Sequence, residues 1–372
     1  MEQLKQIIKE LTSISGVSSR EDKVISYMIK SLKPYGDQIE VDPLGNVTCS
    51  FFSSVSNPKK LMLFAHMDEI GFIVRKVEEN GFLRVERIGG VHVNVLPGLK
   101  VDVIGSKGVI PGLIGTTSHH FTKQDQKGKV PTDGMYVDIG ARTREHVKEL
   151  GVNVGSFITY HSDFTELAGD LISNKAMDNR AACASLLLLA QELFQIKDKL
   201  QWNIHLVACV QEEFNIRGIM PVVRKLSPDV SIGIDVTPSC DTPDMSGYSD
   251  VIIGNGPAIT CMNFHGRGTL AGVLPDEGLF NQIVTIAEQQ NIPLQYEVAL
   301  GVITENAFIS FAEQGIMTAG FSIPTRYTHT PIETVCLSDV KALIHVLFHF
   351  LQSLTTHTSF GKQYILEKGG AQ

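Results

Sequence analysis

The order of apolar and polar positions in the first seventy residues predicts two helices and one strand. Apolar side chains recur at positions 4, 7, 8, 11 and 14, which is the spacing of an amphipathic helix. A second helix is expected up to residue 32, and Ser18 and Glu21 have the spacing of a capping box at its start. The run Leu61–Ala65 is continuously apolar, as in a strand that is buried on both faces. His66 follows this strand directly.

The pattern changes twice along the rest of the chain. Short β-type segments, separated by Gly, Pro and Asn turns, make up residues 70–163. From about residue 170 onward, helical and strand-like segments alternate, which is typical of a layered α/β sheet. We therefore predict a discontinuous α/β domain, formed by residues 1–69 and 164–372, into which residues 70–163 are inserted as an all-β, barrel-like domain.

Composition and charge narrow the functional classes. Among 372 residues, 43% are hydrophobic and 19% charged, as in an ordinary folded protein. The formal net charge of −8 argues against nucleic acid and anionic membranes as partners, and no run reaches the ~18 apolar residues of a membrane span. The six cysteines contain no CxxC pair, which favours buried thiols in a reducing compartment. We therefore expect a cytoplasmic protein. Neither a GxSxG motif nor a P-loop is present.

Candidate chemistry collects where the predicted strands end, which is where open α/β sheets place their ligands. Seven side chains with metal-binding or acid–base chemistry lie there or before a helix: His66, Asp68, Asp178, Glu212, Glu213, Asp235 and His329. Each alone could belong to a polar loop, a helix cap or a solvated turn. Adjacent carboxylates repel each other, however, and a divalent cation removes that conflict. Their joint recurrence therefore indicates a metal site.

Five motifs, in this order and spacing, resemble the tetrahedral aminopeptidases: AHMDEIGF, KAMDNR, QEEFNIRG, IDVT and PTRYTHTPIE. That family includes glutamyl aminopeptidases, and some of its members are labelled endoglucanases. The resemblance extends over nearly the whole chain and agrees with the inserted β-domain. It implies a phosphorylase/hydrolase-like catalytic domain with a layered mixed sheet, and a metalloprotease that releases N-terminal residues from short peptides.

The resemblance also implies a cofactor and its ligands. Two divalent metal ions per subunit are expected, either zinc or cobalt, because mixed His and carboxylate sites bind both. It assigns His66 and Asp235 to one ion, Glu213 and His329 to the other, and Asp178 to both. A water held between two such ions is positioned and acidified.

Two further roles and an assembly follow from the resemblance. Asp68 would accept the second ring N–H of His66 and so fix its tautomer. Glu212 would be the general base, and later the acid toward the leaving amine. The family forms homo-oligomers through the inserted domain, among them a tetrahedral dodecamer.

Two positions depart from the family pattern, and two alternative functions stay open. Asn179 stands where the family usually has Asp, and Glu305 replaces an Asp after Thr304. A deacylase or carboxypeptidase could use the same metal pair, with Arg326 as the partner of a substrate carboxylate. A non-catalytic assembly protein could keep the metals as a structural clamp, for which Asn179 and Glu305 are the only support. The sequence specifies neither the preferred side chain nor the physiological metal.

Overall fold

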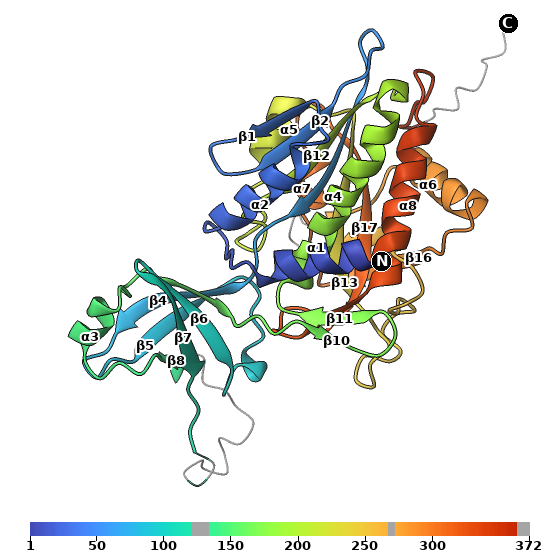
Figure 1. The fold of residues 1–372 in the computed structure, drawn as a ribbon. Coiled ribbons are helices and arrows are strands. Elements are labelled where there is room, and N and C mark those ends of the chain that lie inside the picture. Colours follow the sequence, from blue (N-terminus) through green and yellow to red (C-terminus); the bar gives the residue numbers. More distant parts are fainter. Residues whose placement is uncertain (119, 121–133, 267–271, 363–372) are drawn as a thin grey trace, which may run out of the picture.

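The computed structural model describes residues 1–118, 120, 134–266 and 272–362. Within these ranges the chain forms a mixed sheet of twelve strands and, beside it, a closed β-barrel (Figure 1). The strands of the sheet are β1 (Gln38–Val41), β2 (Val47–Phe51), β3 (Lys60–His66), β10 (Thr165–Glu166), β11 (Leu171–Asn174), β12 (Asn203–Cys209), β13 (Val230–Pro238), β14 (Ala258–Phe264), β15 (Gly272–Val273), β16 (Gln295–Leu300), β17 (Met317–Arg326) and β18 (Glu333–Cys336).

The centre of this sheet is parallel. Its main path runs β1-β2-β12-β3-β13-β17-β18-β11-β10, and β14 pairs with β15, β16 and β17 beside it. β12, β3, β13 and β17 are parallel neighbours, with Cys209 paired to His66. Because parallel strands end at the same edge of a sheet, these four strands deliver the residues that follow them to one place. The continuous apolar run of β3 is explained by burial on both faces.

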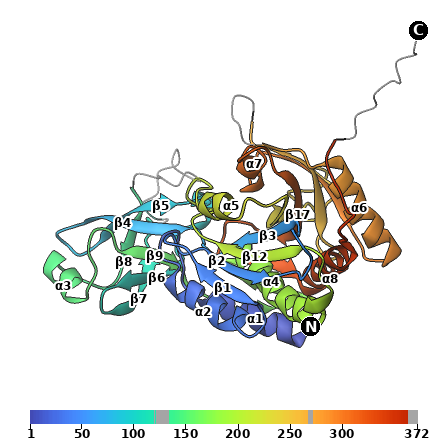
Figure 2. The ribbon, with the colours of Figure 1, turned by 90° about the horizontal axis from the view of Figure 1, so that it is seen from above.

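Helices cover both faces of the sheet (Figure 2). The helices on one face are α1 (Glu2–Ser13), α2 (Asp22–Leu32), α4 (Met177–Ile196), α6 (Glu277–Gln289) and α8 (Leu337–Ser353). α4 lies between α1, α8 and the sheet, which is why its sequence is apolar nearly all round. The shorter α5 (Met220–Leu226) and α7 (Asn306–Ile309) contribute to a second core on the opposite face. Among the described residues, η1 (Val93–Val95) and η5 (Lys197–Lys199) are 3-10 turns.

The second body is a barrel with its own apolar core. Its strands are β4 (Gly71–Val77), β5 (Leu83–Ile88), β6 (Lys100–Gly105), β7 (Gly108–Ile114), β8 (Tyr136–Asp138) and β9 (Phe157–Tyr160), closed in the order β4-β5-β8-β7-β6-β9. Phe72, Val103 and Ile158 are among its fully buried side chains. The short α3 (Arg144–Glu149) is capped by Thr143, which accepts a hydrogen bond from the amide of His146. The sheet and the barrel together confirm the predicted fold class, while the domain limits at 70 and 163 stay a prediction.

The predicted capping box at the start of α2 is wrong. The hydroxyl of Ser18 donates to Asp68 Oδ2 at 2.6 Å, and Glu21 Oε1 accepts from the amides of Ser19 at 2.8 Å and of Gln211 at 3.2 Å. α2 begins at Asp22 without a side-chain cap. Both side chains are buried. The Ser18 hydroxyl binds a partner distant in the sequence, and Glu21 binds the amide of Ser19 in place of that of Ser18.

Two expectations from composition can be compared with the structure. All six cysteines are free, and five of them are buried while Cys261 is partly exposed. Among the helices of the described ranges, none combines the length and apolarity that a membrane crossing requires.

Candidate metal centre

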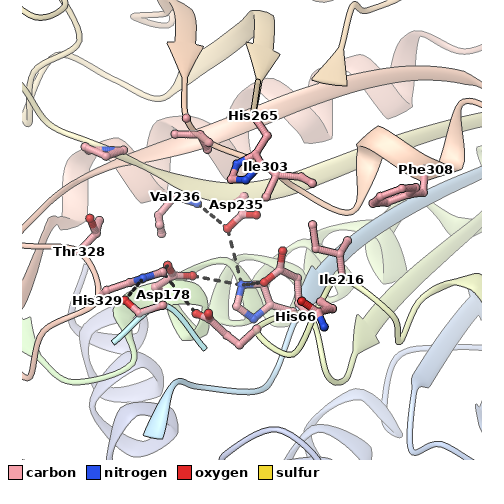
Figure 3. Close-up of a pocket in the computed structure, with 17 residues that line it drawn as sticks. His66, Asp178, Ile216, Asp235, Val236, His265, Ile303, Phe308, Thr328 and His329 are labelled. Carbon is pink, nitrogen blue, oxygen red and sulfur yellow. Dashed lines mark hydrogen bonds and ion pairs between the residues drawn. The ribbon is translucent and has the colours of Figure 1, made fainter. Parts of the chain in front are cut away.

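The predicted site residues meet at the carboxyl edge of the parallel strands (Figure 3). His66 is the last residue of β3, and Glu212 and Glu213 follow β12 after two residues. Asp235 lies within β13, and His329 follows the end of β17. Asp178 and Asp68 complete the group, the former at the start of α4 and the latter two residues after β3.

Two sets of donor atoms share the carboxylate of Asp178. On one side, His66 Nε2 lies 3.1 Å from Asp178 Oδ1 and 3.7 Å from Asp235 Oδ1. On the other side, His329 Nε2 lies 3.4 Å from Asp178 Oδ2 and 3.6 Å from Glu213 Oε1. Each set brings its ligand atoms within 4.8 Å of one another. Asp178 thus presents a different oxygen to each imidazole.

These separations fit divalent cations. Donor atoms bonded to tetrahedral zinc at ~2.0–2.2 Å lie about 3.3–3.6 Å apart, close to the distances within each set. Asp178 Oδ1 is buried and accepts no hydrogen bond, although an imidazole nitrogen is 3.1 Å away. A buried carboxylate oxygen without a hydrogen bond is costly, and a bound cation would compensate it.

The backbone around Asp178 is shaped by polar contacts. Asp178 and Asn179 lie within α4 but have non-helical backbone angles. The amide of Asp178 donates to Glu333 Oε2 at 3.0 Å, and Asn179 Nδ2 donates to the carbonyl of Ile234 at 2.8 Å. A carboxylate at position 179 could donate that second bond only if it were protonated. The departure from the family pattern therefore adds a direct link to the strand that carries Asp235.

Asp68 has a different set of partners from the one expected. Its Oδ1 accepts from the amide of Glu212 and its Oδ2 from the amide of Glu213, each at 3.0 Å. His66 Nδ1 lies 3.4 Å from Asp68 Oδ1 and makes no hydrogen bond. Asp68 is fully buried. It therefore orders the backbone of the two adjacent glutamates, a contact that the sequence did not indicate.

Comparisons with known proteins agree with this geometry. The family model of the M42 glutamyl aminopeptidases matches residues 45–346. The chain belongs to the M42 glutamyl aminopeptidase family. The resemblance predicted from the five motifs is thereby confirmed.

Individual relatives of this M42 chain cover almost its whole length. SgcX of Escherichia coli (strain K12), named as a predicted aminopeptidase, is 43% identical over 345 residues, 92% of each chain. An aminopeptidase from Desulfurococcus kamchatkensis superposes with a TM-score of 0.88 at 32% identity, covering 95% of this chain and 96% of that one. TET1 peptidase of Pyrococcus horikoshii superposes with a TM-score of 0.84 at 26% identity, covering 94% of this chain and 100% of that one. That peptidase can assemble into a tetrahedron or a large octahedral shell.

Two further contacts to the M42 site were not predicted from the sequence. The buried Glu333 accepts from the amide of His329 through Oε1 at 2.7 Å and from the amide of Asp178 through Oε2. The imidazole Nδ1 of His329 lies 2.9 Å from the carbonyl oxygen of Gly90, to which it donates, in the loop after β5. Glu333 is part of the PTRYTHTPIE motif, so its position was marked. Gly90 is 239 residues away from His329, and no local pattern indicates the contact.

A buried ion pair lies beside the turn that leads to Asp178. Lys175 Nζ lies 2.7 Å from Glu69 Oε2, and both side chains are at most 2% exposed. Glu69 also accepts from the hydroxyl of Thr159 in β9 and from the amide of Gly16. The pair therefore connects the barrel to the turn that precedes Asp178.

Burial and mutual charge shift the pKa values of this cluster. Burial raises the pKa of Glu212 well above its ordinary value, and that of Glu213 to about 8. Burial opposes ionisation of Asp178, yet the nearby imidazoles of His329 and His66 outweigh it and keep its pKa below the ordinary value. Burial lowers the pKa of His329, but the nearby carboxylates of Glu213 and Asp178 raise it to about 11. Without metal the cluster retains protons, which a cation must displace.

An open cavity of about 640 Å³ lies over the metal centre. The described residues that line it include His66, Asp178, Glu212, Glu213, Asp235 and His329. Arg326, the candidate partner for a substrate carboxylate, is not among the described residues that line this cavity. Its guanidinium is paired with Asp241.

Proposed function

We propose that this M42 chain is an aminopeptidase that uses two divalent metal ions per subunit to release N-terminal residues from short peptides. The observation that carries the proposal is the pair of donor sets on the two oxygens of Asp178. A single ion would need only one of these sets. Two sets on one bridging carboxylate are the arrangement that a pair of ions requires.

The proposed ligands follow from the distances. His66 and Asp235 would hold one ion, Glu213 and His329 the other, and Asp178 both. Imidazole combined with carboxylate suits zinc and cobalt. When bound, such ions act as Lewis acids that polarise a peptide carbonyl and acidify a water molecule.

Glu212 is proposed as the general base and acid. Its carboxylate lines the cavity and lies 3.9 Å from His66 Nε2, outside the two sets that share Asp178. The backbone amide of Glu212 is fixed by Asp68, which directs the side chain toward the cavity. Burial raises the pKa of this carboxyl, so it can take a proton at a carboxylate oxygen and then pass it to the leaving amine. Glu213 faces His329 instead and is left free for metal binding.

The charges around the cavity support amine recognition over carboxylate recognition. The lining residues that the structure describes include four carboxylates and neither Lys nor Arg. A carboxypeptidase needs a cation for the terminal carboxylate of its substrate, and Arg326 is occupied by Asp241. A free α-amine needs no such cation, so a lining without Lys or Arg is compatible with an aminopeptidase.

For assembly, we propose that the barrel of residues 70–163 mediates homo-oligomerisation. The support is the likeness to TET1 peptidase, which can assemble into a tetrahedron. A shell of that kind would restrict access to short or unfolded peptides.

The test is a panel of aminoacyl p-nitroanilides with free and N-acetylated amines, after addition of zinc, cobalt or manganese. We expect metal-dependent turnover of free-amine substrates only. Glu212→Gln should lower kcat by roughly 10²–10⁴-fold, the usual contribution of general acid–base catalysis, and retain both metals. Glu313→Gln, at an exposed position, is the matched control.

The alternatives give different results in the same panel. Cleavage confined to acetylated substrates would establish a deacylase. Absence of turnover despite two bound metals per chain would establish the non-catalytic clamp.

A further inference from the structure

The cavity over the metal centre has two chemically distinct walls. One consists of the proposed metal ligands and Glu212, and the other is apolar, with Ile216, Ile303 and Phe308 (Figure 3). In Figure 3 these three side chains lie on the His66 side of the site, away from Thr328. Every acidic residue among the described lining belongs to the metal centre.

The apolar wall is anchored in the fold. Ile303 lies in the loop between β16 and α7, and Phe308 is part of α7. α7 is fixed by Ile309, which is fully buried in the core on that face of the sheet, and by Asn306 Nδ2, which donates to the carbonyl of Ala319 at 3.0 Å. Such an anchored wall is preformed, as specificity pockets usually are.

The third apolar residue, Ile216, lies in the same loop as Glu212. The amide of Ile216 donates to the carbonyl of Glu212 at 2.7 Å. The apolar wall therefore begins four residues after the proposed general base. A substrate whose scissile bond lies near Glu212 places its N-terminal side chain within reach of this wall.

We infer that this wall selects peptides with an apolar N-terminal residue, such as leucine, methionine or phenylalanine. This inference rests on the proposed aminopeptidase function. A glutamate side chain would lose water there without gaining a cation, and a lysine would find no carboxylate that is free of the metal centre. His265 also lines the cavity, but an imidazole is not a permanent cation. The preference differs from the glutamyl specificity in the family's name.

The direct test is kcat/KM for leucyl, glutamyl and lysyl p-nitroanilides with the metal-loaded full chain. We expect the leucyl substrate to exceed both others by at least about tenfold, the usual range for a hydrophobic subsite. Equal or higher values for the glutamyl or lysyl substrate would overturn the inference.

Charge substitutions in the wall sharpen the test. Ile303→Arg should lower kcat/KM for the leucyl substrate and raise kcat/KM for the glutamyl substrate. Ile303→Asp should instead raise kcat/KM for the lysyl substrate. Val41→Arg introduces the same charge on β1, where Val41 is 45% exposed, and should leave all ratios unchanged. Opposite shifts in the two Ile303 variants cannot come from general damage. If neither variant folds, the wild-type ratios decide.

A binding measurement separates this inference from the proposed function. The increase in Tm caused by free L-leucine is compared with the increases caused by L-glutamate and L-lysine. If no substrate is turned over, the proposed function fails. The Tm increases caused by the free amino acids still test whether the wall prefers an apolar side chain. A larger shift with leucine supports it, and an equal or larger shift with glutamate or lysine refutes it.

Discussion

The two halves of the metal centre are built in different ways. His66 ends a strand that is buried on both faces, and its side chain is 2% exposed. The side chain of His329 is 37% exposed, and the residue lies in a loop with a backbone φ of +62°. The sheet alone therefore positions one half, whereas the other half depends on loop contacts. We expect the His329 half to bind its ion more weakly.

The barrel contacts the His329 half directly. The Gly90 carbonyl accepts a hydrogen bond from His329 Nδ1, which leaves Nε2 free to face Asp178. A Cβ at Gly90 would lie 2.5 Å from Nδ1 of this ring. Only glycine permits this approach. Among the described residues, none of the barrel forms a hydrogen bond with the imidazole of His66. We therefore expect metal binding at the His329 half to depend on the placement of the barrel.

The largest effect is expected where the two halves join. Asp178→Ala removes the carboxylate that both sets share, so each half should lose its ion. Metal ions contribute several kcal/mol to transition-state stabilisation, so we expect hydrolysis to fall by at least about 10³-fold. Metal content after gel filtration is the measurement. Retention of one ion with normal affinity would show that the halves are independent.

An intermediate effect is expected from the barrel side. Gly90→Ala should displace the ring of His329 and weaken one ion by roughly 10–100-fold, as substitutions around metal ligands commonly do. The second ion, on His66 and Asp235, should keep its affinity. Isothermal titration of the metal-free variant with zinc would resolve the two affinities.

The matched control for that variant is Gly278→Ala. Its added Cβ would meet no atom closer than 3.4 Å, so both affinities should match those of the wild type. Equal weakening of both ions in Gly90→Ala would contradict a barrel contact specific to the His329 half.

The last effect is on stability and concerns a buried carboxyl beneath the sheet-built half. Glu305 lines a small cavity with His66 and Asp235, and burial raises its pKa to about 8. The unfolded chain loses this proton near pH 4.5 while the folded chain keeps it. The free energy of unfolding should therefore fall as pH rises from 4.5 to 8, by up to about 1.4 kcal/mol per pH unit. Glu305→Gln should lack the part of this decrease that comes from Glu305.

Urea unfolding of the metal-free protein at pH 5 and pH 8 measures this dependence. The wild type should lose stability between the two values, and Glu305→Gln should lose less. Glu313→Gln, at an exposed position, should behave like the wild type. Identical losses in all three proteins would refute a buried proton on Glu305.

The sequence predicted the parts of this molecule that local patterns encode. Apolar runs located the parallel strands, and the polar residues after them, such as His66 and Glu212, lie together as expected. The contacts that orient those residues could not be predicted in this way. Asp68 and Glu333 accept from backbone amides far away in the sequence, and the carbonyl of Gly90 accepts from the imidazole of His329. Neither spacing nor charge marks such partners. The capping box failed for the same reason, because Ser18 binds a residue fifty positions away.

The most direct test is a count of metal ions per chain along a series of chelator concentrations, with leucyl hydrolysis measured on the same samples. We predict two ions in the zinc-loaded wild type, lost in two steps, with activity disappearing as the first ion leaves. A single ion at saturation, or hydrolysis that persists without metal, would contradict a two-ion centre built on Asp178.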